Sequence, residues 1–355
     1  MIAMSGGVDS SVAACLLKES GCACTGVTMK LFDNEDIGAD RDDVCCSLRD
    51  ASDARSVAGK LGFPHYVFNF SRDFDEFVIE KFIKEYERGR TPNPCIDCNR
   101  RLKFDRLFSR ARQIGCDFIA TGHYARIERD ERSGRFLLKK ALDGTKDQSY
   151  VLYMLTQEQI SHTLFPLGGL KKSEVREIAT QRGFVNAQKN ESQDICFVPD
   201  SRYADFIERR RGRRGEPGDF IDESGRTIGR HKGLLRYTIG QRRGLGISSP
   251  DKLFVCGMSV SDNTVTLGGE DSLLSSVLFA DGFNLLSREA IDRPLRVNAM
   301  TRYRQVERPA TVEAIGQDKI RVTFDTPQRA VAPGQAVVLY EDDTVLGGGT
   351  IVAMR

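Results

Sequence analysis

Residues 5–11 read Ser5-Gly6-Gly7-Val8-Asp9-Ser10-Ser11 and join a short apolar segment, Ile2–Met4, to a helix-like segment, Ser10–Ser20. Glycine lets the backbone approach a phosphate closely, and the N–H groups at a helix start attract anions. The serines add hydroxyl donors, and Asp9 is suited to position magnesium or a water. The loop lacks the Gly-Lys-Ser/Thr of a Walker loop and the G-x-G-x-x-G spacing of a dinucleotide site. We therefore predict a phosphate-binding loop between a strand and a helix; a glycine turn without a ligand is the plainer alternative.

Strand-like and helix-like segments alternate from this loop to Thr121. Apolar residues at helical spacing run from Leu48 to Leu61, with Ser47 as a suitable cap. The predicted strands are Ile2–Met4, Thr25–Leu31, Tyr66–Phe70 and Phe118–Thr121, and the predicted helices are Ser10–Ser20, Ser47–Leu61, Phe74–Arg88 and Asn99–Ile114. This alternation favours a parallel sheet covered by helices, so we predict an α/β catalytic domain over residues 1–202.

The pattern changes near Tyr203. Glycine, arginine and short strand-like pieces follow, with an apparent hairpin over Phe254–Leu267 around Asp262-Asn263. Every later predicted element is a strand: Arg296–Arg302, Ala310–Ile315, Ile320–Phe324, Ala336–Tyr340 and Gly348–Ala353. Turn residues separate these strands, as in a small barrel. We predict a small central domain over residues 203–272 and a C-terminal β-barrel over residues 273–355.

Composition is typical of a globular protein: of 355 residues, 40% are hydrophobic and 29% charged. No run of about 18 apolar residues predicts a transmembrane helix. The segment Met1–Ser5 lacks the basic start and apolar stretch of a signal peptide, so we expect a cytoplasmic protein. Between Arg202 and Arg243, twelve Lys or Arg stand against six Asp or Glu, an excess of six within a net charge of +2. This basic segment suggests a polyanionic partner, and the run Arg209–Arg214 is either a phosphate contact or a solvated face.

Two cysteines stand at C-x-x-C spacing in Thr91-Pro92-Asn93-Pro94-Cys95-Ile96-Asp97-Cys98-Asn99. If Asn99 caps the following helix, either thiol lies near a helix N-terminus, which lowers the pKa of a cysteine. A zinc ribbon would need a second pair, which the chain lacks, and a thioredoxin-like motif would directly follow the first strand. Cys196 is a third candidate for thiol chemistry, although a lone cysteine is more often a buried structural residue. The remaining cysteines, Cys45-Cys46 included, are assigned structural roles.

The Ser-Gly-Gly-x-Asp-Ser pattern resembles the pyrophosphate-binding loop of the ATP-pyrophosphatase (PP-loop) superfamily. Members of that superfamily cleave ATP to AMP and pyrophosphate by adenylating a carbonyl oxygen. Together with the C-x-x-C pair and Cys196, the chain resembles the tRNA-specific 2-thiouridylase family. Further matching stretches are Cys45-Cys46-Ser47-Leu48, Gly89–Pro94, Ala120–Tyr124, Lys146–Tyr150 and Tyr237–Leu245. The matches cover nearly the whole chain.

The resemblance implies a PP-loop domain, a small central domain and a β-barrel that grips tRNA. It implies that ATP, with Mg²⁺, is held by Ala3, Met4, Ser5, Gly6, Gly7, Val8, Asp9, Ser10, Met29 and Gly122. It implies that tRNA contacts Asn93, Pro94, Cys95, His123, Lys146, Asp147, Gln148, Arg302, Tyr303 and Gln335. The family's nucleophile corresponds to Cys98 and its persulfide carrier to Cys196, and these two cysteines would form a transient disulfide.

Cys95 departs from the family pattern, in which many members carry Asp at this position. Three cysteines, Cys95, Cys98 and Cys196, suffice to hold a 4Fe–4S cluster with one iron open for sulfide, as in related sulfur-transfer enzymes. Two routes therefore remain: a persulfide delivered by a sulfur-donor protein, which we prefer, and a cluster supplied with sulfide.

The expected activity is ATP-dependent 2-thiolation of the wobble uridine, position 34, of tRNA. ATP would adenylate the O2 atom of the base, and cysteine-borne sulfur would then displace AMP. The target base must leave the anticodon stack to enter such a site. Two alternatives stay open: another PP-loop adenylating enzyme, such as an amidotransferase-type synthetase, and a non-catalytic RNA-binding protein that keeps the fold.

Overall fold

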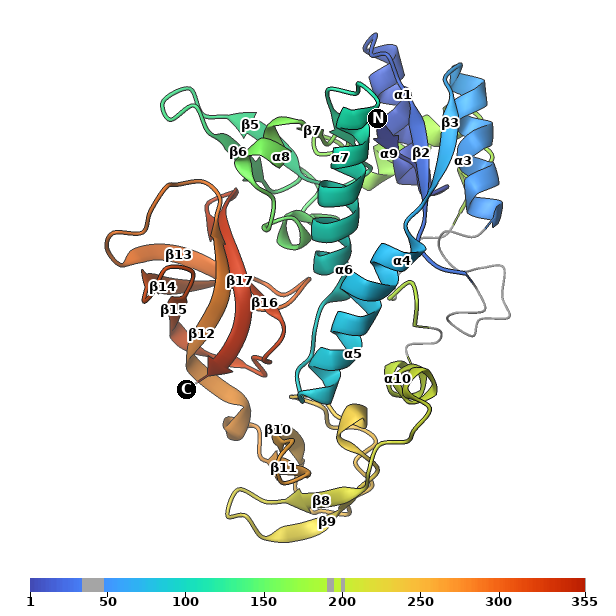
Figure 1. Ribbon diagram of the computed structural model, residues 1–355. Coiled ribbons are helices and arrows are strands. Elements are labelled where there is room, and N and C mark those ends of the chain that lie inside the picture. The colour runs from blue at the N-terminus through green and yellow to red at the C-terminus, as the bar shows by residue number, and fades with distance from the viewer. Residues whose placement is uncertain (34–47, 190–194, 199–201, 355) are drawn as a thin grey trace.

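The strand before the glycine loop, β1 (Ile2–Ala3), lies at the centre of a five-stranded sheet in the computed structural model (Figure 1). The sheet order is β3-β2-β1-β4-β7, and every neighbouring pair is parallel. The other strands are β2 (Gly26–Lys30), β3 (His65–Asn69), β4 (Ile119–Ala120) and β7 (Thr163–Leu164). The structure describes residues 1–33, 48–189, 195–198 and 202–354, so Cys45, Cys46 and the expected cap Ser47 lie outside the described residues.

Helices cover both faces of this sheet, because successive strand residues point to opposite faces and both faces are apolar. Ile2 and Ala120 belong to one core, which also contains residues of α1 (Val8–Glu19), α3 (Leu48–Leu61) and α9 (Lys172–Gln181). Val27 and Ile119 belong to the other core, which α7 (Leu107–Gln113) covers. The predicted α/β class with a helix-covered parallel sheet is confirmed.

Two long helices lead away from the sheet, and each contains a π-helical segment. The first consists of α4 (Ser71–Phe74), the π segment η1 (Asp75–Ile79) and α5 (Glu80–Glu87). The second consists of α6 (Pro94–Asp97), the π segment η2 (Cys98–Arg106) and α7. The predicted start at Asn99 is wrong, because Asn93 caps this helix: its Oδ1 accepts a hydrogen bond from Cys95 N at 3.1 Å, and Pro94 follows at the first helical position. Cys98 therefore lies inside the helix, at the start of the π segment.

Residues 122–189 complete the first domain with elements that the sequence patterns did not predict. Besides β7 and α9, they are β5 (Arg126–Arg129), β6 (Phe136–Lys139), the 3₁₀ helix η3 (Ser149–Val151) and α8 (Gln157–Ser161). The β5–β6 hairpin is antiparallel, and Lys139 of β6 pairs with Thr344 of the C-terminal barrel. This pairing joins the first domain directly to the last.

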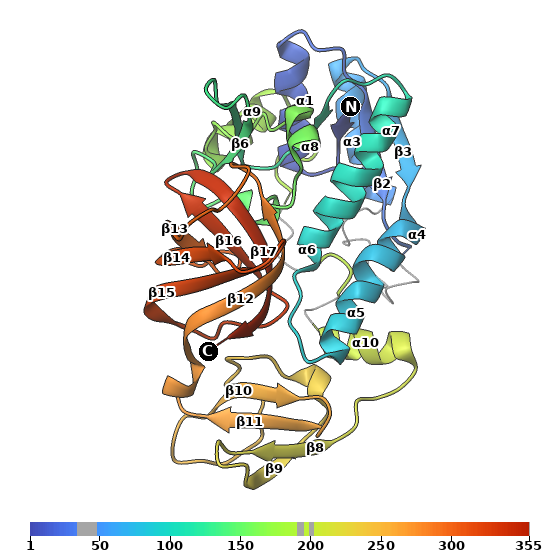
Figure 2. The ribbon, with the colours of Figure 1, turned by 60° about the vertical axis from the view of Figure 1, so that its left-hand side comes forward.

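The central region contains α10 (Tyr203–Arg211) and a four-stranded sheet of order β10-β11-β8-β9. Its elements are β8 (Gly218–Ile221), β9 (Thr227–His231), η5 (Leu234–Arg236), β10 (Phe254–Ser259) and β11 (Thr264–Gly268). The predicted hairpin corresponds to β10 and β11, and Asn263 in its turn has φ 50°. Figure 2 shows α5 reaching from the first domain towards this sheet, with α10 beside it.

Six antiparallel strands form the predicted C-terminal barrel, which the pairing of β12 with β17 closes. After η6 (Asp271–Leu273) come β12 (Leu274–Leu285), β13 (Leu295–Met300), β14 (Arg308–Ala314), β15 (Ile320–Arg329), β16 (Ala336–Glu341) and β17 (Thr344–Met354). The sequence patterns missed β12, in which two serines, an aspartate, a glycine and an asparagine interrupt the apolar residues. Within the described residues, every helix is too short or too polar to span a lipid bilayer.

Candidate functional site

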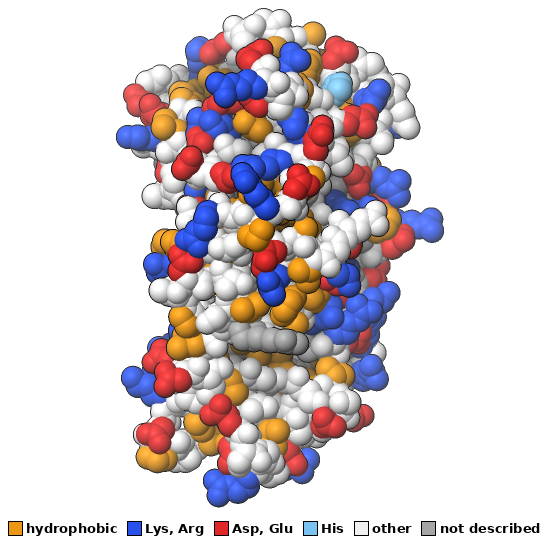
Figure 3. Space-filling view, turned by 90° about the vertical axis from the view of Figure 1, so that its left-hand side faces the viewer, with side chains coloured by type: hydrophobic (Ala, Val, Ile, Leu, Met, Phe, Trp, Pro, Cys, Tyr) orange, Lys and Arg blue, Asp and Glu red, His pale blue; other side chains and the backbone are white. Residues whose placement is uncertain are grey.

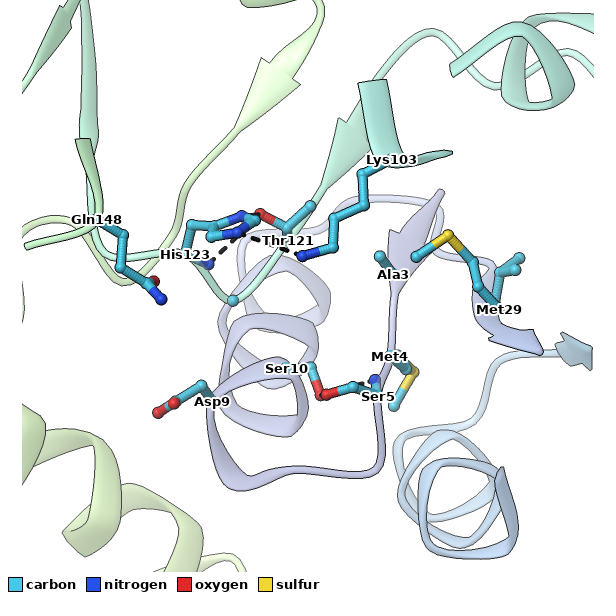
Figure 4. A pocket seen from close by; sticks show the side chains of 12 residues that line it. Ala3, Met4, Ser5, Asp9, Ser10, Met29, Lys103, Thr121, His123 and Gln148 are labelled. Carbon is cyan, nitrogen blue, oxygen red and sulfur yellow. Dashed lines mark hydrogen bonds between the residues drawn. The ribbon is translucent and has the colours of Figure 1, made fainter. Parts of the chain in front are cut away.

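A cavity of about 200 Å³ opens beside the glycine loop, at the carboxyl edge of the parallel sheet (Figure 4). Residues from β1, α1, β2, η2 and the segment after β4 line it: Ala3, Met4, Ser5, Asp9, Ser10, Val27, Met29, Lys103, Thr121, Gly122, His123 and Gln148. Seven of the ten residues expected to hold ATP are in this set, together with His123 and Gln148, which were expected to face tRNA. Val27, Lys103 and Thr121 are additions that the sequence analysis did not identify.

The glycine loop leads into α1 without a side-chain cap. Gly7 is the N-cap residue, and it has no side chain that could accept a hydrogen bond from the N–H groups of the first turn. The nearby hydroxyls bond within the loop instead: Ser10 Oγ donates to Gly7 O at 3.1 Å and accepts from Ser5 N at 3.2 Å. Several N–H groups of the first turn therefore have no side-chain acceptor from the cap, which suits an anion at this helix end.

Two glycines let the backbone pack closely around the cavity. Gly6 has φ +73°, and a Cβ built there would lie 2.3 Å from Asp50 O. A Cβ on Gly122 would lie 2.8 Å from Ser10 N and 2.9 Å from Asp9 C. Since real Cβ atoms do not approach backbone so closely, the loop packs against α3 only with glycine at position 6, and the segment after β4 packs against the start of α1 only with glycine at position 122.

Asp9 is held by two groups at the start of α1. Its Oδ1 accepts a hydrogen bond from Tyr124 Oη at 2.8 Å and from Lys172 Nζ at 2.6 Å. Lys172 is buried, so solvent screens its charge little, and its ammonium offsets the negative charge of the Asp9 carboxylate.

His123 is buried in the cavity wall as a neutral imidazole. Its Nδ1 lies 2.7 Å from Thr121 Oγ1, and its Nε2 lies 3.5 Å from Lys103 Nζ. Burial lowers the pKa of His123 well below its usual value, and the Lys103 ammonium lowers it further. Gln148, on the same side of the cavity, accepts a hydrogen bond from Tyr124 N at 3.0 Å. These two side chains present neutral polar groups beside the loop.

The thiol of Cys98 does not show the lowered pKa that the sequence suggested. Burial raises the pKa of Cys98 to about 11; Lys103 lowers it, and Cys95 and Asp97 raise it. Burial is the main cause, and the earlier helix start gives no compensation because Cys98 lies beyond the N-terminal N–H groups that stabilise a thiolate. Cys95, one turn earlier, is exposed.

Cys196 packs against the same apolar core as Cys98, although almost a hundred residues separate them in sequence. Its neighbour Phe197 is buried and lies edge-on to Phe74 and Phe82, with ring centroids 5.6 and 5.2 Å apart. These contacts fix the chain beside Cys196 to the first long helix. Among the described residues, no three His, Cys, Asp or Glu side chains are grouped to hold a metal ion, so Cys95, Cys98 and Cys196 do not form a cluster site in this conformation.

Two of the remaining residues expected to face tRNA, Gln335 and Tyr303, lie at the junction between the first domain and the barrel. Gln335 Nε2 donates to Thr91 O at 2.7 Å, which attaches the barrel to the segment before Asn93. The ring centroid of Tyr303 lies 5.9 Å from that of Tyr150. Asp147 is turned inward: it accepts hydrogen bonds from Ala141 N and Ser149 Oγ, and burial raises its pKa. The other members of the set are Asn93, Pro94, Cys95, Lys146 and Arg302.

Part of the basic run Arg209–Arg214 forms ion pairs within the protein. Arg211 contacts both Glu80 and Glu87 of α5, and Arg210 pairs with Asp75. These contacts hold α10 against the first long helix. On the face drawn in Figure 3, Lys and Arg side chains are interspersed with Asp and Glu.

Sequence patterns did not identify four side chains around the loop and the cavity. Lys103 and Lys172 belong to no motif, and Asn186 and Lys189 follow α9 in an irregular segment. Asn186 Nδ2 donates to Gly6 O and to Ser11 Oγ, both at 2.9 Å, and Lys189 Nζ lies 3.3 Å from Gly6 O. No spacing rule connects these residues with residues 5–11, since only the tertiary fold brings them together.

Family models match three consecutive parts of the chain. The model described as "tRNA methyl transferase HUP domain" matches residues 1–200, "tRNA methyl transferase PRC-barrel domain" matches residues 204–269, and "Aminomethyltransferase beta-barrel domain" matches residues 275–351. These stretches correspond to the helix-covered sheet, the central sheet and the barrel.

Curated relatives match over almost the full length. A protein named tRNA-specific 2-thiouridylase MnmA from Clostridioides difficile is 50% identical over 351 residues, covering 99% of this chain and 97% of the relative. Proteins of the same name from Symbiobacterium thermophilum and Desulforamulus reducens are 50% and 49% identical, each over 99% of this chain and over 91% and 96% of the relative.

Proposed function

This chain belongs to the tRNA-specific 2-thiouridylase family, and from that premise we propose that it replaces O2 of the wobble uridine of tRNA with sulfur, using ATP. The observation that carries the proposal is the shared cavity beside the glycine loop. There Ser5, Asp9 and Ser10 lie across from His123 and Gln148, so that one site has room for both a nucleotide phosphate and a base. The enzyme is a tRNA sulfurtransferase.

The first step activates a poor leaving group. The uridine O2 attacks the α-phosphorus of ATP, the bond to pyrophosphate breaks, and N3 of the base releases its proton. The uncapped start of α1 and the hydroxyls of Ser5 and Ser10 bind the phosphates. Magnesium, held through Asp9, would supply further charge neutralisation to the departing pyrophosphate.

The second step transfers sulfur. A persulfide on Cys196 attacks C2 with its terminal sulfur, and the C2–O2 bond breaks as AMP leaves with the electron pair. The Cys98 thiolate then attacks Cys196 Sγ, which releases the sulfur on the base and joins the two cysteines in a disulfide. N3 regains a proton, and an external dithiol reduces the disulfide before the next turnover.

We favour this persulfide route over a 4Fe–4S cluster on Cys95, Cys98 and Cys196. The donor set does not fit a cluster in this conformation, because these three thiols are not among any metal-holding group of the described residues. The persulfide route needs only Cys98 and Cys196 and a sulfur-donor protein. Cys95 then faces the tRNA side of the site, as its exposure allows.

We further propose that the three domains share the substrate. The helix-covered sheet binds ATP and the target base. The central domain and the barrel bind the tRNA body, the barrel through Arg302, Tyr303 and Gln335. The junction between the first domain and the barrel, where Gln335 meets Thr91, leads to the segment that carries Asn93 and Cys95. Because tRNA is the substrate, we assign the protein to the cytoplasm.

A reconstitution experiment tests the function. Protein purified without oxygen is incubated with unmodified tRNA, ATP, magnesium and a sulfide source, and the digested tRNA is analysed by mass spectrometry. Appearance of 2-thiouridine at position 34 together with AMP supports the proposal, and iron measured in the same sample decides between the two routes. ATP cleavage without thiouridine would indicate another carbonyl substrate, and absence of both products would indicate an RNA-binding protein without activity.

A further inference from the structure

We propose that Lys103 is a further catalytic residue of this reaction, and that its ammonium binds the α-phosphate of ATP and of the adenylated uridine. The inference rests on the proposed function and adds a group that neither the glycine loop nor the cysteine motif supplies. Lys103 belongs to η2, the π-helical segment that begins at Cys98. Its side chain lines the cavity from the side opposite the loop.

The position of the ammonium fits a phosphate between the two walls of the cavity. In Figure 4 the Lys103 side chain extends towards His123, with Ala3 and Ser5 across the opening. Its contact with His123 Nε2, at 3.5 Å, is at the limit of a hydrogen bond, and burial keeps that imidazole neutral. Lys103 therefore faces a polar partner that leaves its charge uncompensated.

The charge of the cavity supports the same assignment. Of the residues lining the cavity, Asp9 and Lys103 carry full charges, and Lys172 already pairs with Asp9 at 2.6 Å. In the part of the chain that the structure describes, Lys103 forms no salt bridge, whereas the two other lysines beside the loop, Lys172 and Lys189, pair with carboxylates. The cavity is thus left with one net positive charge, placed where an anion must bind.

The π-helical segment explains how one helix supplies both a thiol and a cation. In an α-helix, with 3.6 residues per turn, positions five apart point in clearly different directions. In a π-helix the hydrogen bonds join residues five apart, so Cys98 and Lys103 lie about one turn from each other on a similar face. The electrostatic effect of Lys103 on Cys98 is consistent with this proximity.

The chemical role follows from where charge develops. As O2 bonds to the α-phosphorus and the bond to pyrophosphate breaks, negative charge grows on the non-bridging oxygens of that phosphorus. When sulfur attacks C2 and the C2–O2 bond breaks, AMP leaves with the electron pair and its phosphate gains charge. A fixed ammonium on this phosphate stabilises both transition states without accepting or donating a proton.

Replacing the lysine with an uncharged residue of similar length tests the proposal. For Lys103→Met we expect tRNA-dependent ATP–pyrophosphate exchange to fall by about 10²–10³-fold in kcat, the range for loss of one preorganised donor. The dissociation constant for unmodified tRNA should stay within about threefold, because the contact that is lost is to the α-phosphate of ATP and not to the tRNA. Arg110→Met is the matched control, since Arg110 is exposed on the same long helix and bonds Gln113 at 3.0 Å. An exchange rate in Lys103→Met equal to that of the control would overturn the proposal.

A second readout separates this role from activation of the neighbouring thiol. Exchange needs no sulfur chemistry, so a lysine that acts on the α-phosphate should lose exchange and thiouridine formation together in Lys103→Met. If Lys103→Met impairs only thiouridine formation and leaves exchange intact, the lysine acts on Cys98 and the phosphate assignment is wrong. Wild-type protein that makes no thiouridine would instead overturn the proposed function, so the two failures are distinguishable.

Discussion

The amide nitrogen of Asn186 lies 2.9 Å from the carbonyl oxygen of Gly6, and the same nitrogen donates to Ser11 Oγ at 2.9 Å. Asn186 is buried, at 2% exposure, and comes after α9, 180 residues along the chain from the loop that it supports. One side chain therefore connects the glycine that adopts positive φ with the first turn of α1. Lys189 Nζ adds a longer contact to Gly6 O at 3.3 Å and pairs with Asp50 and Asp53 of α3.

Removing the Asn186 amide should weaken both stability and ATP use. We expect Asn186→Ala to lower the free energy of unfolding by about 1–3 kcal/mol, since two buried hydrogen bonds are lost. Asn186→Asp keeps the shape but places a carboxylate opposite Gly6 O, so the KM for ATP should rise more than in the alanine variant. Urea denaturation and steady-state kinetics measure these effects, and the exposed Gln181→Ala serves as control. Equal KM values in all three variants would show that the loop does not depend on Asn186.

Gly122 is expected to tolerate no side chain. A Cβ there would meet the backbone of Asp9 and Ser10 at under 3 Å, so Gly122→Ala must push the segment after β4 away from α1. We expect ATP binding to weaken by at least about tenfold, the effect of a misplacement near 1 Å. Gly169→Ala is the matched control, because its Cβ would meet nothing within 4 Å. Isothermal titration with a non-hydrolysable ATP analogue measures both variants, and similar affinities would contradict the steric argument.

The Cys98 thiol should react slowly at neutral pH in the unliganded enzyme. Since burial raises its pKa to about 11, the thiolate fraction is small at pH 7, and the rate of alkylation should grow about tenfold per pH unit up to pH 10. The same raised pKa makes the free energy of unfolding depend on pH. Because the pKa of Cys98 is raised from 9.0, its contribution to stability is fully present below pH 9 and is lost between pH 9 and about 11. Peptide mass spectrometry after iodoacetamide pulses measures the alkylation of Cys98 separately from that of the other cysteines, with a short cysteine peptide as control. A Cys98 rate that levels off below pH 8 would show the thiol to be activated already.

Much of the fold follows from local patterns, because the helix-covered sheet and the barrel both have regular apolar periodicity. The alternation from Ile2 to Thr121 indicated the parallel sheet, and the strands after residue 295 indicated the barrel. Strand β12 (Leu274–Leu285) was missed, since it is interrupted by polar residues and is held by pairing with both β15 and β17. Its assignment depends on closure of the barrel, which no local window contains.

The parts of the site that belong to a sequence motif could be predicted, whereas the single side chains that come from elsewhere in the chain could not. The glycine loop has a recognisable order of residues, and Gly122 and His123 lie in a stretch that resembles a known family. Lys103 and Asn186 carry no such signal, because one lysine or asparagine in a polar segment is ordinary. The thiolate expectation for Cys98 failed because burial, which raises its pKa, depends on tertiary packing. The helix start was also misplaced, since Asn93 and Asn99 are both suitable caps.

Arg211 and Arg214 belong to the same basic run but should behave differently when their charges are reversed. Arg211 bonds Glu87 through Nε at 2.9 Å and Glu80 at 3.1 Å, so Arg211→Glu gathers three carboxylates between α10 and α5 and should lower the free energy of unfolding by about 1–3 kcal/mol. The double variant Arg211→Glu/Glu87→Arg restores one opposite-charge pair and should recover part of that loss.

Arg214 is exposed, so Arg214→Glu should leave stability unchanged while it weakens tRNA binding. It should also reduce the slope of log binding constant against log salt concentration by about one. Thermal melts and filter binding at several salt concentrations measure the two quantities. If Arg211→Glu weakens tRNA binding without loss of stability, its ion pairs are not structural and the whole run acts as the phosphate contact.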